Sequence, residues 1–130
     1  MAMRRIIQTG LAPKAVGPYS QAVASNGVLY VSGQLGLDPE SMELVGGLEE
    51  QTRQALVNMG QILRAAKTDY KNVLKTTVLL TNMDHFTIVN NVYKEFFKED
   101  PPARACYAVA GLPKNGLVEI EAIAQLEQTG

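Results

Sequence analysis

Cysteine and histidine are almost absent from this sequence, and their scarcity excludes several kinds of site. With one cysteine, Cys106, the chain cannot form an internal disulfide, and one histidine, His85, leaves no spacing typical of a metal centre. The two residues fall in different predicted elements, so a Cys–His catalytic pair is not expected. We therefore predict a site that holds no metal.

Long apolar runs, basic clusters and phosphate-binding loops are also missing. No apolar run approaches the roughly 18 residues of a transmembrane helix, and the N-terminus lacks the apolar region of a signal peptide. We expect a cytoplasmic protein without a membrane partner, and a mitochondrial or nuclear pool is left open. The net charge is −1 and Arg4-Arg5 is the only adjacent basic pair, which gives little support to nucleic-acid binding. Neither Gly-x-Gly-x-x-Gly nor Gly-x-x-x-x-Gly-Lys occurs.

What the chain does contain is an alternation of strand-like and helix-like segments. Its 130 residues, 46% of them apolar, suit a single domain spanning residues 1–130. Asn26-Gly27 indicates a tight hairpin turn, and apolar residues at spacings of three and four indicate helices. The predicted strands are Arg4–Gln8, Ala22–Ser25, Val28–Ser32, Val73–Leu80, Ala103–Ala110 and Val118–Leu126, and the predicted helices are Leu48–Ala66 and one that begins at Met83-Asp84 with Asp84 as its N-cap.

This order of elements predicts an α+β fold in which both amphipathic helices cover one face of a sheet. The opposite face then meets either solvent or another subunit. Four small apolar strand residues, Ala103, Ala105, Ala122 and Ala124, are expected on that uncovered face. Since an apolar face is poorly suited to water, oligomerisation is the expected remedy.

Arg104 is a lone charge in an apolar strand, where it shares a face with Cys106. A charge in such a place is costly unless it is paired, so it indicates either a permanent partner or a ligand. The alternatives are that Arg104 pairs with a nearby glutamate or caps an exposed edge. As a ligand-binding group it suits a carboxylate, because the planar guanidinium donates two parallel hydrogen bonds.

Two carboxylates, Glu119 and Glu121, share one face of the last predicted strand. They form either a solvent-facing acidic stripe or a group that activates water. Tyr19 follows Gly-Pro and is either a core aromatic, which its residue type favours, or a hydroxyl presented to a pocket. Gly33 lies at a predicted strand end, where it either allows a ligand to come close or simply makes a turn. Together these residues fit recognition of a small carboxylate and activation of water.

Five segments resemble, in order, the signature segments of the RidA (YjgF, L-PSP) family of imine deaminases, especially its animal members. The segments are Gly17-Pro18-Tyr19-Ser20-Gln21-Ala22, Val31-Ser32-Gly33-Gln34, Lys75-Thr76-Thr77-Val78, Pro102-Ala103-Arg104-Ala105-Cys106 and Val118-Glu119-Ile120-Glu121-Ala122. The resemblance implies a chorismate-mutase-like mixed β-sheet with two helices on one face, assembled as a homotrimer. It also implies hydrolysis of 2-iminobutanoate and 2-iminopropanoate to 2-oxo acids and ammonia, without a cofactor.

The resemblance further assigns roles to individual residues. Arg104 matches the family's substrate-carboxylate arginine, and Glu119 matches the glutamate that holds the attacking water. The matching pocket positions are Tyr19, Ser32, Gly33, Asn90 and Cys106. Two other functions remain open: cleavage of single-stranded RNA with inhibition of translation, described for animal relatives, and a ligand-binding or chaperone-like trimer without chemistry.

Overall fold

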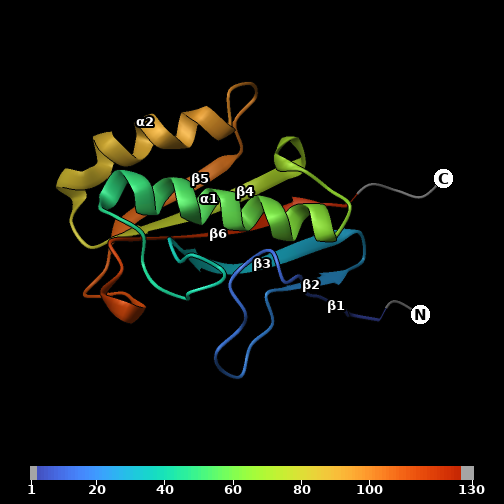
Figure 1. Ribbon diagram of the computed structural model, residues 1–130. Coiled ribbons are helices and arrows are strands. Elements are labelled where there is room, and N and C mark those ends of the chain that lie inside the picture. The colour runs from blue at the N-terminus through green and yellow to red at the C-terminus, as the bar shows by residue number, and fades with distance from the viewer. Residues whose placement is uncertain (1–2, 127–130) are drawn as a thin grey trace.

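The computed structural model describes residues 3–126, which form one six-stranded sheet with two α-helices (Figure 1). The predicted order of strands and helices is confirmed. The strands are β1 (Arg5–Ile7), β2 (Ala22–Ser25), β3 (Val28–Leu35), β4 (Val73–Leu80), β5 (Ala103–Ala108) and β6 (Val118–Gln125). The helices are α1 (Leu48–Ala65) and α2 (Phe86–Phe96), and short 3₁₀ turns occupy Tyr70–Asn72, Met83–His85 and Pro113–Asn115.

The sheet is mixed, with the strand order β1-β2-β3-β6-β4-β5. β4 and β5 are parallel, and α2 lies between them in the chain because a parallel pair needs a crossover connection. The other neighbouring strands are antiparallel. The C-terminal strand β6 is therefore central, whereas β5 forms an edge of the sheet.

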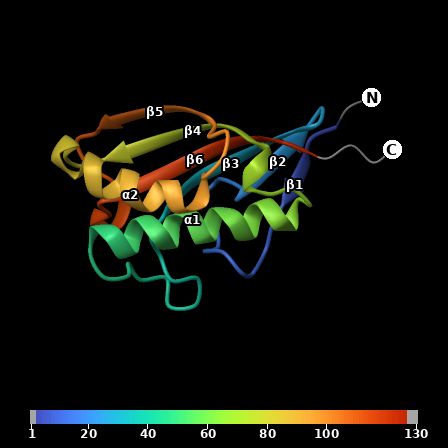
Figure 2. The same ribbon diagram turned by 90° about the horizontal axis from the view of Figure 1, so that it is seen from above.

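Both helices cover the same face of the sheet, as predicted (Figure 2). The apolar stripe of α1 is completely buried at Leu56, Met59, Ile62 and Leu63. These side chains pack between the helices and the sheet in one hydrophobic cluster. Burial of this stripe fixes which face of each strand points toward the helices.

The uncovered face differs from the prediction in two of its residues. Ala122 and Ala124 are 3% and 0% exposed, because they alternate with Glu121 and Ile123 and point toward the helices. A row of paired residues does cross the uncovered face of all six strands, and it runs Ile6, Val23, Tyr30, Ile123, Lys75, Ala103. This face is apolar mainly through larger side chains such as Tyr30.

Several predicted element ends are wrong: β5, for example, ends at Ala108 rather than Ala110, and two further ends differ more. The second α-helix begins at Phe86, because Met83–His85 forms a 3₁₀ turn. The cap of that turn is Asn82, whose side-chain oxygen accepts a 2.8 Å hydrogen bond from the backbone nitrogen of Asp84. The third strand does not end at Ser32, because it resumes pairing with β6 beyond that point. This irregularity lies at the candidate site.

Candidate active site

A β-bulge in β3 places two of the predicted pocket residues. Val31 pairs with Ala122 of β6 and Gln34 pairs with Ile120, so Ser32 and Gly33 both lie opposite a single residue. Such a bulge bends the strand and changes where its side chains point. The Ser32 hydroxyl donates a 2.6 Å hydrogen bond to the Ser20 carbonyl, and this bond joins β3 to the loop that carries Tyr19.

The missing side chain of Gly33 makes room for Glu119. A Cβ atom at Gly33 would lie 2.8 Å from the carboxyl carbon of Glu119, closer than atoms can approach. Glu119 is half-buried, and this burial, together with the neighbouring charge of Glu121, raises the pKa of its carboxyl group. A carboxylate with a raised pKa is a better proton acceptor near neutral pH.

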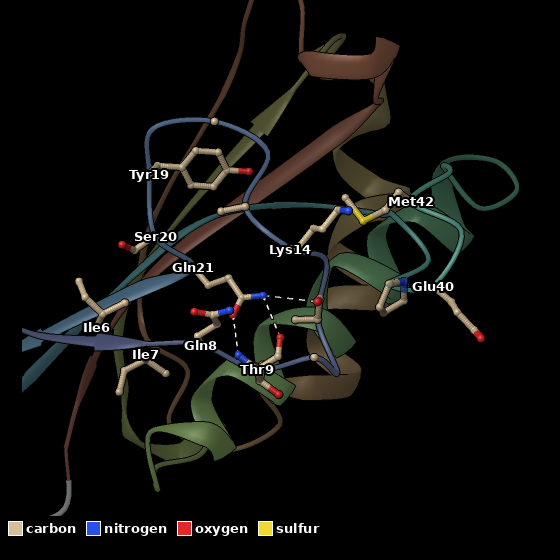
Figure 3. Close-up of a pocket in the computed structure, with 15 residues that line it drawn as sticks. Ile6, Ile7, Gln8, Thr9, Lys14, Tyr19, Ser20, Gln21, Glu40 and Met42 are labelled. Atoms are coloured by element: carbon tan, nitrogen blue, oxygen red, sulfur yellow. Dashed lines mark hydrogen bonds between the residues drawn. The ribbon is translucent and has the colours of Figure 1, made fainter.

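The loop before β2 is held in place by Gln21, a residue to which the sequence analysis gave no role. Its buried side-chain amide donates to the carbonyls of Thr9 (3.1 Å) and Pro13 (2.9 Å), and its oxygen accepts from the Thr9 nitrogen (2.8 Å). Figure 3 shows this side chain in the wall of a cavity of about 620 Å³. A polar amide at a strand start, directly after a Gly-Pro loop, is the signal that could have identified it.

Tyr19 is not a core residue, contrary to what its residue type favours. Its backbone nitrogen donates to the Gly17 carbonyl at 2.8 Å, and this turn leaves the side chain 50% exposed. The phenol oxygen accepts a long hydrogen bond of 3.4 Å from the Val16 nitrogen. The ring lines the cavity of Figure 3 and a second cavity beside β3.

This second cavity, of about 400 Å³, gathers four of the predicted site residues: Tyr19, Ser32, Gly33 and Glu119. Its rim also contains residues that the sequence analysis missed, among them Lys14, Met42 and Lys114. The Lys114 ammonium donates a 2.7 Å hydrogen bond to the Met42 carbonyl, so two loops meet at the rim. The cavity is large enough for a small ligand beside the Glu119 carboxylate.

Arg104 lies on edge strand β5 beneath α2, and its guanidinium contacts three residues of that helix. One terminal nitrogen donates a 2.7 Å hydrogen bond to the side-chain oxygen of Asn90. The guanidinium carbon lies 4.9 Å from the centre of the Tyr93 ring and 5.5 Å from that of Phe86. Within residues 3–126 the one ion pair joins Arg53 to Glu95, so the pairing of Arg104 with a glutamate is not found there.

Cys106 follows Arg104 on the same face of β5 and is partly buried against the core. Burial raises the pKa of its thiol, and the nearby Arg104 charge opposes that shift without cancelling it. The thiol therefore stays protonated at neutral pH and is a weak nucleophile. Cys106 suits the wall of a pocket better than a covalent role.

Arg104 and Glu119 lie on opposite faces of the sheet. Arg104 pairs with Thr76, which is completely buried under the helices, whereas Glu119 pairs with Leu79, three residues further along β4. Side chains alternate along a strand, so residues three apart point to opposite faces. One chain thus contains two half-sites: Tyr19, Ser32, Gly33 and Glu119 on one side, and Asn90, Arg104 and Cys106 on the other.

Within the part of the chain that the structure describes, no group of three or more His, Cys, Asp or Glu side chains could hold a metal ion. None of the helices described is long and apolar enough to cross a membrane.

Comparison with known proteins identifies the family. A family model described as endoribonuclease L-PSP matches residues 9–126. A goat (Capra hircus) protein named 2-iminobutanoate/2-iminopropanoate deaminase is 58% identical over 123 residues, which cover 94% of this chain and 90% of the relative. The crystal structure of RidA from an Antarctic Psychrobacter is 46% identical with a TM-score of 0.92 and covers 94% of this chain and 99% of that one. The structure of E. coli TdcF with bound serine is 39% identical with a TM-score of 0.91, over 95% and 99% of the two chains. The chain therefore belongs to the RidA/YjgF/L-PSP family.

Proposed function

We propose that this chain hydrolyses 2-iminobutanoate and 2-iminopropanoate to the corresponding 2-oxo acids and ammonia. The goat relative that bears this activity in its name is 58% identical, and its match covers 94% of the chain. The observation that carries the proposal in this structure is the half-buried Glu119, whose carboxyl pKa is raised inside a cavity of about 400 Å³. Binding of an amino acid by the TdcF neighbour also agrees with a small carboxylate ligand.

Arg104 binds the carboxylate of the imino acid. Asn90 occupies one N–H of the guanidinium, and the other donors remain for two parallel hydrogen bonds to the substrate. These bonds fix the orientation of the imine carbon. Because a protonated imine is already electrophilic, orientation supplies much of the rate acceleration.

Glu119 acts on water. Its carboxylate accepts a proton as the water oxygen bonds to the imine carbon, and the product of this addition is a carbinolamine. The proton then passes to the nitrogen. The C–N bond breaks and ammonia leaves, while the Glu119 carboxylate accepts the hydroxyl proton of the carbinolamine and the C=O bond forms. The raised pKa of Glu119 suits both the acceptance and the return of the proton.

We further propose that the complete site forms between subunits of a homotrimer in the cytoplasm. The Glu119 half-site and the Arg104 half-site of one chain lie on opposite faces of its sheet, so two chains are needed to bring them together. The uncovered face supplies an apolar surface for such contacts, with Ile6, Tyr30 and Tyr107 each about half exposed. A cyclic trimer would contain three equivalent sites.

The proposed activity is tested by coupling the purified protein to a threonine dehydratase, which releases 2-iminobutanoate, and by following loss of the imine and appearance of 2-oxobutanoate. The wild type should accelerate both, and Glu119→Gln should lower kcat at least tenfold while Glu121→Gln, the matched control on the same strand face, changes it less. A wild-type protein that does not accelerate loss of the imine would contradict the proposal. A protein without imine turnover that cleaves single-stranded RNA, and still does so as Glu119→Gln, would favour the alternative function instead.

A further inference from the structure

The guanidinium of Arg104 lies against one stripe of α2. Phe86, Asn90 and Tyr93 are spaced by four and three residues, so their side chains lie on the same face of the helix. Two of them present aromatic rings to the cation, at 5.5 Å for Phe86 and 4.9 Å for Tyr93. A cation within about 6 Å of a ring centre is attracted to the ring face.

Tyr93 differs from Phe86 because both its ring and its hydroxyl are fixed. The side chain is 6% exposed, and its ring packs 4.7 Å from the ring of Phe97. Its hydroxyl forms a 2.7 Å hydrogen bond with the hydroxyl of Thr76, which is completely buried. The ring that faces Arg104 therefore belongs to the rigid core.

Thr76 also connects this ring to Arg104 through the sheet. Thr76 is the residue of β4 that pairs directly with Arg104 of β5. Thr76 thus fixes both the backbone of Arg104, through strand pairing, and the Tyr93 ring, through its hydroxyl. The Cα atom of Arg104 and the ring that its guanidinium contacts are therefore held at a fixed distance from each other.

We propose that Tyr93 is a positioning residue that fixes the Arg104 guanidinium for the substrate carboxylate through its aromatic ring. The proposal rests on the role given above to Arg104. Asn90 holds one guanidinium nitrogen through a hydrogen bond, whereas the Tyr93 ring lies under the whole group and restricts its movement. A guanidinium restricted in this way binds a carboxylate through two hydrogen bonds without first losing rotational freedom.

The test compares Tyr93→Leu, which removes the ring, with Tyr93→Phe, which keeps it. In the coupled imine assay, Tyr93→Leu should raise KM roughly tenfold with a smaller change in kcat, and Tyr93→Phe should restore KM to within about threefold of the wild type. Tyr70→Leu is the matched control, because Tyr70 is a partly buried tyrosine whose hydroxyl donates a 2.6 Å hydrogen bond to the Leu56 carbonyl, and its ring is not among those that contact Arg104. Its KM should stay within about twofold.

Two further measurements do not depend on turnover. Titration with 2-oxobutanoate, which carries the same carboxylate, should give a higher dissociation constant for Tyr93→Leu than for the wild type, Tyr93→Phe and Tyr70→Leu. In the wild-type protein, the ring current of Tyr93 should displace the NMR chemical shift of the Arg104 Nε–H from the value of a solvent-exposed arginine. The signal is assigned by its loss in Arg104→Lys. This spectrum is informative even if Tyr93→Leu does not fold.

The outcomes separate this inference from the proposed function. A wild type without imine turnover would overturn the function, while the binding and NMR measurements would still test the positioning role. Unchanged KM in Tyr93→Leu, equal damage in Tyr93→Phe, an equal KM change in Tyr70→Leu, or an undisplaced Arg104 signal would each overturn the inference.

Discussion

At the scale of single residues, Glu119 links function to stability. Burial raises the pKa of its carboxyl group above the ordinary value of 4.5, and the charge of Glu121 adds to this shift. The folded protein therefore favours the protonated form more strongly than the unfolded chain does. The corresponding contribution to stability is complete below pH 4.5 and is lost as pH rises through the raised folded pKa.

This linkage predicts that Glu119→Gln is more stable than the wild type at neutral pH, because glutamine cannot ionise. The difference in melting temperature should shrink as pH falls toward 4.5, where Glu119 is increasingly protonated. Thermal unfolding followed by circular dichroism at several pH values measures it. Glu121→Gln, in which the exchanged residue is exposed, should show a smaller difference. A melting temperature for Glu119→Gln that stays below the wild type at neutral pH would contradict the account.

Gly33→Ala tests the contact that positions this carboxylate. The added methyl group would meet the end of a flexible side chain, so we expect Glu119 to move and the protein to remain folded. Displacement of the carboxylate should lower kcat/KM by roughly ten- to a hundredfold in the coupled assay. Gly111→Ala is the matched control, because a Cβ there has no neighbour within 4 Å, and its kcat/KM should not change. Wild-type activity in Gly33→Ala would show that Glu119 does not need this position.

At the scale of elements, α1 fixes the strands that carry the Glu119 half-site. The side-chain amide of Asn58 donates to the carbonyls of Leu35 (3.2 Å), the last residue of β3, and Leu37 (2.9 Å), just beyond it. The side-chain oxygen of Gln51 accepts a 3.0 Å hydrogen bond from the Leu117 nitrogen, just before β6. The helix thus holds the end of β3 and the start of β6, which lie at the same end of this antiparallel pair, next to Gly33 and Glu119.

The close approach of Gly36 to the backbone of α1 predicts that Gly36→Ala lowers the stability of the protein. A Cβ atom at Gly36 would lie 2.4 Å from the Cα atom of Gln51, and backbone cannot move aside as a side chain can. We expect the free energy of unfolding to fall by about 1–3 kcal/mol, as measured by urea denaturation. Gly10→Ala, where a Cβ has no neighbour within 4 Å, is the control. Equal stability of the two variants would mean that α1 can shift without cost.

The elements themselves were predictable from the sequence because their signals are local. The spacing of Leu56, Met59 and Leu63 reports a buried helix stripe, and Asn26-Gly27 reports a tight turn. The separation of Arg104 from Glu119 was not predictable in this way. It follows from the insertion of β6 between β3 and β4 and from the parallel pairing of β4 with β5, which depend on contacts far apart in the chain.

Only part of the candidate site could be predicted from local signals in the sequence. Alternation along one strand correctly placed Arg104 with Cys106 and Glu119 with Glu121. The exposure of Tyr19 could not be inferred, because it depends on the conformation of the loop that Gln21 holds. The aromatic contacts of Arg104 with Phe86 and Tyr93 were missed because helical spacing alone assigns such residues to the core.

At the scale of the whole molecule, the two half-sites predict complementation between inactive subunits of the proposed trimer. Arg104→Ala and Glu119→Gln should each be impaired alone, but a co-refolded mixture contains interfaces where one chain supplies Arg104 and its neighbour supplies Glu119. Random mixing of equal amounts leaves about a quarter of the interfaces with both residues intact. We therefore expect the mixture to regain up to about a quarter of wild-type activity in the coupled assay.

The matched control for complementation is a mixture of Tyr19→Ala with Glu119→Gln. These two residues line the same cavity within one chain, so any site formed from the mixture lacks one of them, and its activity should stay at the level of the variants. Native mass spectrometry establishes that mixed trimers have formed in both experiments. Mixed trimers of Arg104→Ala and Glu119→Gln that remain inactive would show that Arg104 and Glu119 do not meet across an interface. Recovery in the control mixture would show instead that the Tyr19 and Glu119 of one site come from different chains, because only residues from separate chains can complement each other.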